Sequence, residues 1–102
     1  MRAWTYIVVC SDGSYYTGST TGLERRVVDH NSGRYRGYTL SRLPVVLVWS
    51  QEFSDVRDAI ALERQIKGWS RKKKEALIRG DFQLLHELAH ATVARTKPYP
   101  RS

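Results

Sequence analysis

Cysteine is nearly absent from this chain of 102 residues, which contains only Cys10. One thiol forms no disulfide within the chain and builds no zinc site made of cysteines. Long apolar runs are missing as well, because no run approaches the roughly 20 residues of a membrane span, and the start of the chain lacks a signal-peptide pattern. We therefore expect a reduced, cytoplasmic protein with no membrane partner.

Acidic residues are scarce, with 10 Asp and Glu against 17 Lys and Arg, which gives a formal net charge of +7. Such an excess favours a polyanionic partner, although charge alone is weak evidence. The 41% of hydrophobic and 11% of aromatic residues suffice for one core and exclude general disorder. A single domain over residues 1–95 is expected, followed by a flexible tail at 96–102.

Local patterns predict three strands and four helices. Strands are expected over 4–10, over 15–17 with a break at 18–22, and over 45–49, from their aromatic and β-branched content and the turn residues between them. Helices are expected over 23–30, about 55–67, 71–79 and 82–92. The order of these elements indicates a small α/β or α+β fold, in which helices flank a short, mainly antiparallel sheet of three strands.

The expected helix starts carry residues typical of N-caps. Ser54, Ser70 and Asp81 each precede a helical segment, and their side-chain oxygens can accept a hydrogen bond from the backbone of the first turn. Gly68 and Gly80 follow the second and third helical segments, where glycine commonly ends a helix. These residues set the expected bounds.

Two polar residues adjoin the apolar stripe of the helix expected over 23–30. Leu23 and Val27 mark that stripe by their spacing of four, and Arg26 and His30, also four apart, lie beside it. A hydrogen-bonded, partly buried histidine at a helix end is ordinary, so His30 by itself indicates no chemistry.

Glu63 lies inside the apolar stripe of the next helix. That stripe consists of Val56, Ala59, Ile60 and Ile66. A lone carboxylate is seldom fully buried unless it is paired or binds a cation. Glu63 therefore either forms a structural ion pair with Arg26 or Arg64 or takes part in a functional site.

Two basic segments suit a sugar-phosphate backbone. The loop expected over 32–44 interleaves arginines with tyrosines, so that guanidinium groups can bond phosphates beside aromatic rings. Residues 64–74 hold six basic side chains and no acidic one. The candidates for nucleic-acid binding are Arg34, Arg36, Tyr38, Arg42, Lys67, Arg71, Lys72 and Lys73. Such a protein is expected to be nucleoid-associated.

Four segments, in order, resemble the GIY-YIG nuclease domain. They are Thr5-Tyr6-Ile7, Tyr16-Thr17-Gly18, Leu23-Glu24-Arg25-Arg26-Val27-Val28-Asp29-His30 and Leu62-Glu63-Arg64-Gln65-Ile66-Lys67-Gly68-Trp69-Ser70. The likeness covers roughly residues 4 to 79 and is greatest to the short standalone bacterial members, often called URI-type. The N-terminal nuclease domain of excinuclease C is a more distant relative.

The resemblance implies a divalent-metal-dependent endonuclease acting on DNA that is branched, damaged or single-stranded, with RNA left open. It implies that Tyr6 activates the attacking water with help from His30 or Tyr16, and that Arg26 binds the phosphate. Glu63 would hold Mg²⁺ or Mn²⁺. We expect a monomer, and a protein partner for targeting is left open because this chain has no extra DNA-binding domain.

Two alternatives stay open beside this hypothesis. One is a nucleic-acid-binding module that keeps the fold and the basic surface but has lost catalysis. The other is a nuclease subunit that works only with a partner. The sequence also departs from the family pattern, with Trp4 and Thr5 in place of Gly-Ile and Thr17 in place of the second Ile. The matched tyrosines are kept, so these departures are interpreted as packing changes.

The turn between the first two strands tests the proposed site. A two-residue turn at Asp12-Gly13 would pair Val9 with Tyr16 and send Tyr6 and Tyr16 to opposite faces of the sheet, because side chains alternate along a strand. A shared site requires a longer loop or a bulge that shifts the register by one residue. We predict that irregularity.

Overall fold

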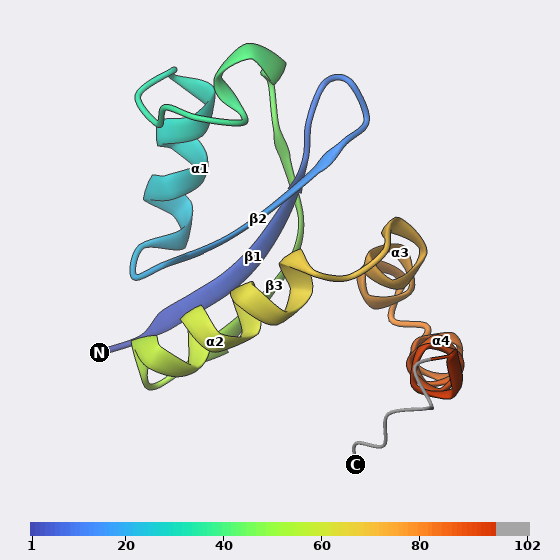
Figure 1. Ribbon diagram of the computed structural model, residues 1–102. Helices are drawn as coiled ribbons and strands as arrows, with labels where there is room; N and C mark the ends of the chain where they lie inside the picture. The colour runs from blue at the N-terminus through green and yellow to red at the C-terminus, as the bar shows by residue number, and fades with distance from the viewer. Residues whose placement is uncertain (96–102) are drawn as a thin grey trace. The chain divides into compact units, whose positions relative to one another are not determined.

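The computed structural model describes residues 1–95, and the tail expected at 96–102 lies outside this range. The chain forms two compact units, the first of residues 1–68 and the second beginning at residue 69 (Figure 1). Each unit is described by itself. The expectation of one domain over 1–95 stays a prediction.

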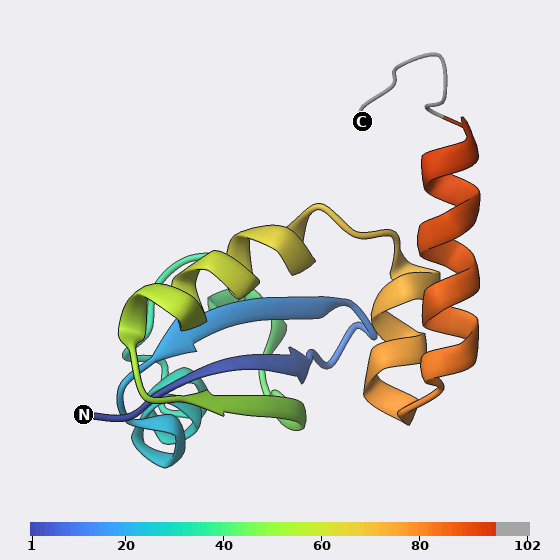
Figure 2. The same cartoon turned by 90° about the horizontal axis from the view of Figure 1, so that it is seen from below.

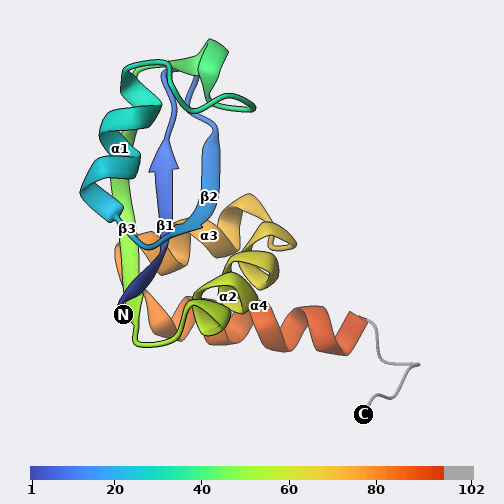
Figure 3. The same cartoon turned by 90° about the vertical axis from the view of Figure 1, so that its left-hand side faces the viewer.

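The first unit is built on a sheet of three antiparallel strands. They are β1 (Ala3–Val9), β2 (Tyr15–Thr20) and β3 (Val46–Phe53), in the order β2-β1-β3 (Figure 3). Its central strand is the most apolar of the three, and the side chains from Thr5 to Val8 are fully buried. The expected α+β class with a small antiparallel sheet is confirmed.

Two helices cover opposite faces of this sheet. In Figure 2, α2 (Val56–Lys67) lies above the strands and α1 (Leu23–Asn31) lies below them. Thr5 points toward α2, where its Oγ1 donates to the Ala59 carbonyl over 2.8 Å. Its neighbour Tyr6 points toward α1. The alternation of side chains along β1 thus assigns each residue of the strand to one helix.

Several expected bounds were wrong. β2 does not break at residue 18 but runs to Thr20, and β3 continues to Phe53. The loop after α1 contains a short 3-10 helix, η1 (Leu40–Arg42). The N-cap of α2 is Asp55 rather than Ser54, and its carboxylate accepts from the Arg57 amide over 2.9 Å.

The apolar stripe expected on α2 is only partly buried. Ala59 and Ile66 are fully buried, whereas Val56 is 37% exposed. Val56 begins the helix directly after its cap. The first turn of α2 therefore carries less of the packing than its spacing predicted.

The second unit contains α3 (Arg71–Arg79) and α4 (Phe82–Arg95), which pack side by side (Figure 2). Ser70 caps α3 as expected, accepting from the Lys73 amide over 3.2 Å, and Asp81 accepts from the Leu84 amide at the start of α4. Gly80 ends α3 with a φ of +73°, a conformation that favours glycine. Within residues 1–95, no helix is long and apolar enough to cross a membrane.

Candidate active site

The connection between β1 and β2 is longer than a two-residue turn. Val9 pairs with Tyr15 and Val8 with Tyr16, so residues 10–14 form the loop. The Asp12 carboxylate accepts hydrogen bonds from the backbone amide and the hydroxyl of Ser14, which closes the loop two residues beyond Asp12. The predicted shift in register is confirmed. Since Tyr6 lies two residues before Val8, Tyr6 and Tyr16 project from the same face.

Tyr6 is fully buried and contacts His30 of α1. Its hydroxyl lies 2.9 Å from His30 Nε2, and the other ring nitrogen, Nδ1, lies 2.8 Å from Thr39 Oγ1. His30 is 0% exposed and Thr39 1% exposed. Three buried polar side chains, from β1, α1 and the loop before η1, therefore form one continuous chain of hydrogen bonds.

The electrostatics keep both Tyr6 and His30 uncharged at neutral pH. Burial raises the pKa of Tyr6 to about 12, and the Arg26 guanidinium beside it offsets this only in part. Burial and then the charge of Arg26 lower the pKa of His30 below its ordinary value. Burial acts in opposite directions on the two groups because it disfavours the anion of one and the cation of the other.

Arg26 is half-buried on α1 and holds the edge strand β2. Its Nη1 donates to the Ser19 carbonyl over 3.4 Å, and its guanidinium lies 4.5 Å from the ring centre of Tyr35. A guanidinium has five N–H donors in a planar fork, so Arg26 can keep this contact and still bind a phosphate oxygen.

Glu63, on α2, is held by two side chains. Ser19 Oγ donates to Glu63 Oε1 over 2.6 Å, and Lys67 Nζ lies 2.8 Å from Oε2. Burial would raise the pKa of Glu63, but the hydrogen bonds from Lys67 and Ser19, together with the charges of Lys67 and Arg64, lower it below its ordinary value. The ion pair of Glu63 is therefore with Lys67, one helical turn away, and not with Arg26 or Arg64 as the sequence suggested.

Glu63 offers an ionised carboxylate to a hard cation, although each of its oxygens already has a partner. The carboxylate is ionised, its side chain is 16% exposed, and one oxygen already carries the ammonium of Lys67. Within the described residues, no group of three or more His, Cys, Asp or Glu could hold a metal. A single carboxylate suits Mg²⁺, which usually keeps several waters and takes further ligands from phosphates.

Ser19 connects the two sides of the site. Its pairing partner in β1 is Thr5, so its side chain lies on the α2 face and reaches Glu63. Its carbonyl accepts from Arg26, which comes from α1. Because β2 is an edge strand, groups from both faces of the sheet can meet around it. The structure thereby brings Tyr6 and His30 into one region with Arg26 and Glu63.

Aromatic rings surround Tyr16. Its hydroxyl lies 3.2 Å from that of Tyr35, and the Tyr38 ring is nearly parallel to it, 18° away with centres 6.1 Å apart. Arg42 lies 3.9 Å from the centre of the Tyr38 ring and forms an ion pair with Asp12. Burial and the neighbouring Tyr35 raise the pKa of Tyr16, so it is a phenol at neutral pH.

The expected nucleic-acid-binding residues fall into three groups. Tyr38 stacks on Tyr16, Arg42 lies over the Tyr38 ring, and Arg34 and Arg36 are exposed on the same loop. Lys67 lies on Glu63. The remaining three, Arg71, Lys72 and Lys73, belong to α3 in the second unit.

Three residues of this region escaped the sequence analysis as site candidates. Ser19 and Thr39 carry no pattern of their own, because serine and threonine are common in strands and loops. Tyr35 was noticed only as part of the basic loop. It contacts Arg26 and Tyr16, and its ring lies 4.4 Å from that of His30. A tyrosine between two arginines was the available signal.

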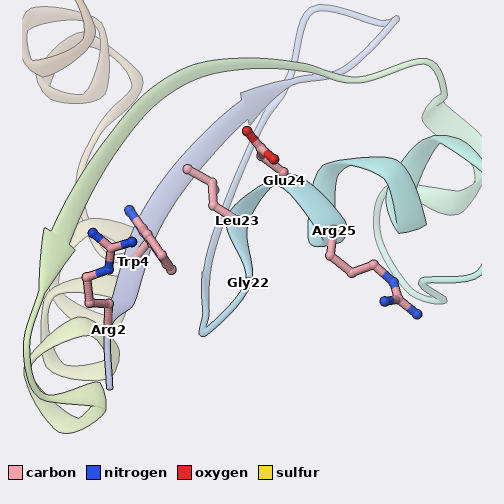
Figure 4. Close-up of a pocket in the computed structure, with 6 residues that line it drawn as sticks. All are labelled: Arg2, Trp4, Gly22, Leu23, Glu24 and Arg25. Carbon is pink, nitrogen blue, oxygen red and sulfur yellow. The ribbon is translucent and has the colours of Figure 1, made fainter.

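A pocket lies elsewhere in the first unit, between the beginnings of β1 and α1 (Figure 4). It is lined by Arg2, Trp4, Gly22, Leu23, Glu24 and Arg25. None of the expected catalytic residues lines it. The candidate site is therefore the cluster around β2 and not this pocket.

Comparison with known proteins gives a match over the part of the chain that carries the candidate site. A family model described as the GIY-YIG catalytic domain matches residues 2–76. The UPF0213 protein of Halobacterium salinarum is 47% identical over 72 residues, which cover 71% of this chain and 94% of the relative. The UPF0213 protein of Streptococcus pneumoniae serotype 4 is 42% identical over 77 residues, which cover 76% and 78%.

Two solved structures are similar to this chain. The UPF0213 protein from Bacillus halodurans, determined by solution NMR, is 42% identical with a TM-score of 0.52, and the match covers 78% of this chain and 84% of that one. A protein from E. faecalis, also determined by NMR, is 36% identical with a TM-score of 0.55, covering 82% and 88%.

Proposed function

The chain belongs to the GIY-YIG family, and on that premise we propose that it is a divalent-metal-dependent endonuclease that hydrolyses phosphodiester bonds in DNA. The observation that carries the proposal is the convergence on β2 of groups suited to this reaction. A buried phenol bonded to a neutral imidazole, an arginine and an ionised carboxylate come together from three elements.

In the proposed reaction, the oxygen of a water attacks phosphorus and the bond to the leaving sugar oxygen breaks. Tyr6 takes a proton from the water while its own phenolic proton passes to His30 Nε2. A phenol whose pKa is about 12 is a weak acid and rarely ionised at neutral pH, so it needs such an acceptor. The leaving oxygen takes up a proton from solvent, and His30 then returns its extra proton to solvent, which completes the hydrolysis.

Arg26 would bind the phosphate and stabilise its growing negative charge through paired N–H donors. Tyr38 and Arg42 would lie beside the bound strand, where a ring can stack on a base and a guanidinium can bind phosphate. Glu63 would hold the divalent cation, which supplies charge stabilisation at the phosphate. These roles use the residues that surround β2.

The test is cleavage of labelled single-stranded, duplex, flap and junction DNA by the pure protein, with Mg²⁺, Mn²⁺ or EDTA. We expect metal-dependent cutting that Tyr6→Phe and Glu63→Gln abolish while both variants stay folded and still bind DNA. Phe keeps the ring of Tyr6 and Gln keeps the shape of Glu63, so each variant removes little besides the reactive group.

Two other results would contradict the proposal. Salt-sensitive binding without cutting under any metal would make the chain a binding module. Cutting that appears only when a cell extract or a purified partner is added would make it a dependent subunit. In the binding-module case, Glu63→Gln would leave DNA affinity unchanged or raise it, because it removes a negative charge next to a polyanion.

A further inference from the structure

The burial of Thr39 is unusual for its place in the chain. Thr39 directly precedes η1 and is 1% exposed, whereas the apolar side chains on either side, Tyr38 and Leu40, are 43% and 40% exposed. The loop thus turns a hydroxyl inward and two apolar side chains outward. Burying a hydroxyl is unfavourable unless it is hydrogen-bonded, and the hydrogen-bond partner of the Thr39 hydroxyl is His30.

The direction of each hydrogen bond follows from the donors available. A phenol is a stronger hydrogen-bond donor than acceptor, so the Tyr6 hydroxyl is assigned as the donor in its contact with His30. The single Tyr6 proton then goes to His30 Nε2, 2.9 Å away. In a neutral imidazole, one nitrogen accepts and the other carries the hydrogen. Nδ1 therefore donates to Thr39 Oγ1, 2.8 Å away.

We propose that Thr39 is a positioning residue of this site, which accepts the Nδ1–H of His30 and so keeps the Nε2 lone pair on the Tyr6 hydroxyl. The inference rests on the proposed function, because the lone pair matters only if Tyr6 passes its proton to His30. In that step the proton moves from Tyr6 Oη to Nε2, and Tyr6 replaces it with a proton from water. Thr39 keeps its own proton throughout and holds the imidazolium through the unchanged Nδ1–H.

The arrangement explains why a hydroxyl is needed here instead of an apolar group of the same shape. Valine would fill the space of Thr39 but would leave the Nδ1–H buried and unpaired. The imidazole would then change tautomer or rotate, and in either case Nε2 would no longer accept from Tyr6. Serine would restore the acceptor and lose only a methyl group.

The experiment compares Thr39→Val with Thr39→Ser, using the chain labelled with ¹⁵N at histidine. Long-range ¹H–¹⁵N spectra identify which nitrogen of His30 carries the hydrogen, without metal or DNA. We expect the Nδ1–H form in the unsubstituted protein and in Thr39→Ser, and a loss of that form in Thr39→Val. With metal and DNA, kcat should fall about tenfold or more in Thr39→Val and recover in Thr39→Ser, with KM nearly unchanged.

Several results would overturn the inference. The inference is wrong if His30 in the unsubstituted protein carries its hydrogen on Nε2. This measurement needs no variant, so it is decisive even if Thr39→Val fails to fold. Full activity in a folded Thr39→Val would overturn the inference as well. The spectra also separate this inference from the proposed function. If the protein cuts no DNA, the proposed nuclease function is wrong. If its His30 nevertheless carries the hydrogen on Nδ1 only while residue 39 has a hydroxyl, the control of the tautomer by Thr39 is still supported.

Discussion

The ring of Tyr6 lies against the backbone of Gly18, its pairing partner on β2. A Cβ atom added at Gly18 would stand 2.5 Å from the Tyr6 hydroxyl and 2.7 Å from Cζ. Real Cβ atoms do not approach other atoms so closely, and Tyr6 is fully buried, so the ring has little room to move. Gly18 in Tyr16-Thr17-Gly18 is thus needed because any larger residue would collide with Tyr6 in Thr5-Tyr6-Ile7.

Gly18→Ala should therefore lower the free energy of unfolding by about 1–3 kcal/mol, the usual cost of overpacking a core. It should also displace the Tyr6 hydroxyl from His30 and abolish cleavage. Urea unfolding and the cleavage assay measure the two effects. Gly68→Ala is the matched control, because a Cβ there would meet its nearest atom, the Gln65 carbonyl oxygen, at an ordinary 3.6 Å. Equal stability losses in the two variants would contradict the packing argument.

Ser19→Ala should weaken metal binding, because Ser19 Oγ fixes Glu63 Oε1 and helps to keep the carboxylate ionised. Residues that hold a metal ligand in place commonly contribute about tenfold or more to affinity. We expect a loss of that size in Mn²⁺ affinity, measured by calorimetry without DNA. Ser50→Ala, at an exposed position of β3, should bind Mn²⁺ like the unsubstituted protein. Unchanged affinity in Ser19→Ala would show that the hydrogen bond does not prepare the site.

Lys67→Met should have the opposite effect on Mn²⁺. The ammonium of Lys67 lies 2.8 Å from Glu63 Oε2, so it competes with a cation for that oxygen and repels it. Its removal should tighten Mn²⁺ binding about two- to fivefold, the range expected for a partly exposed ion pair.

Arg64→Met is the control for Lys67→Met, since it removes the same charge from the same helix without breaking the ion pair. It should change Mn²⁺ affinity less than Lys67→Met. Weaker Mn²⁺ binding in Lys67→Met would mean instead that Lys67 supports the carboxylate and does not compete with the metal.

Stability should depend on His30 below neutral pH. Burial and Arg26 keep the pKa of His30 in the folded chain below the ordinary 6.5, so the unfolded chain binds a proton that the folded chain does not. This contribution is complete above pH 6.5 and is lost as the pH falls toward the folded pKa. The slope for one proton is at most about 1.4 kcal/mol per pH unit.

Urea unfolding between about pH 6.5 and 5 measures that slope, and His30→Gln should reduce it. The slope in His30→Gln should be lower than that in His86→Gln, the control variant at an exposed position of α4. If the slope is the same with and without His30, the imidazole is not held in its neutral form.

The sequence by itself determined most of the elements and the residues they carry. Spacing within one helix placed Arg26 beside His30, and the caps at Ser70 and Asp81 were predictable because a cap is a local hydrogen bond between neighbours in the chain. The motif resemblance added the family, which depends on residue types in order and not on contacts.

The tertiary structure alone decided which of these residues meet. Asp12-Gly13 is a signal for a two-residue turn, yet the connection is a five-residue loop in which Asp12 accepts hydrogen bonds from Ser14. This register places Tyr6 and Tyr16 on one face of the sheet. Thr39 and Ser19 act through partners on other elements. Contacts across elements depend on register and packing over the whole sheet, and spacing within a single segment carries no information about them.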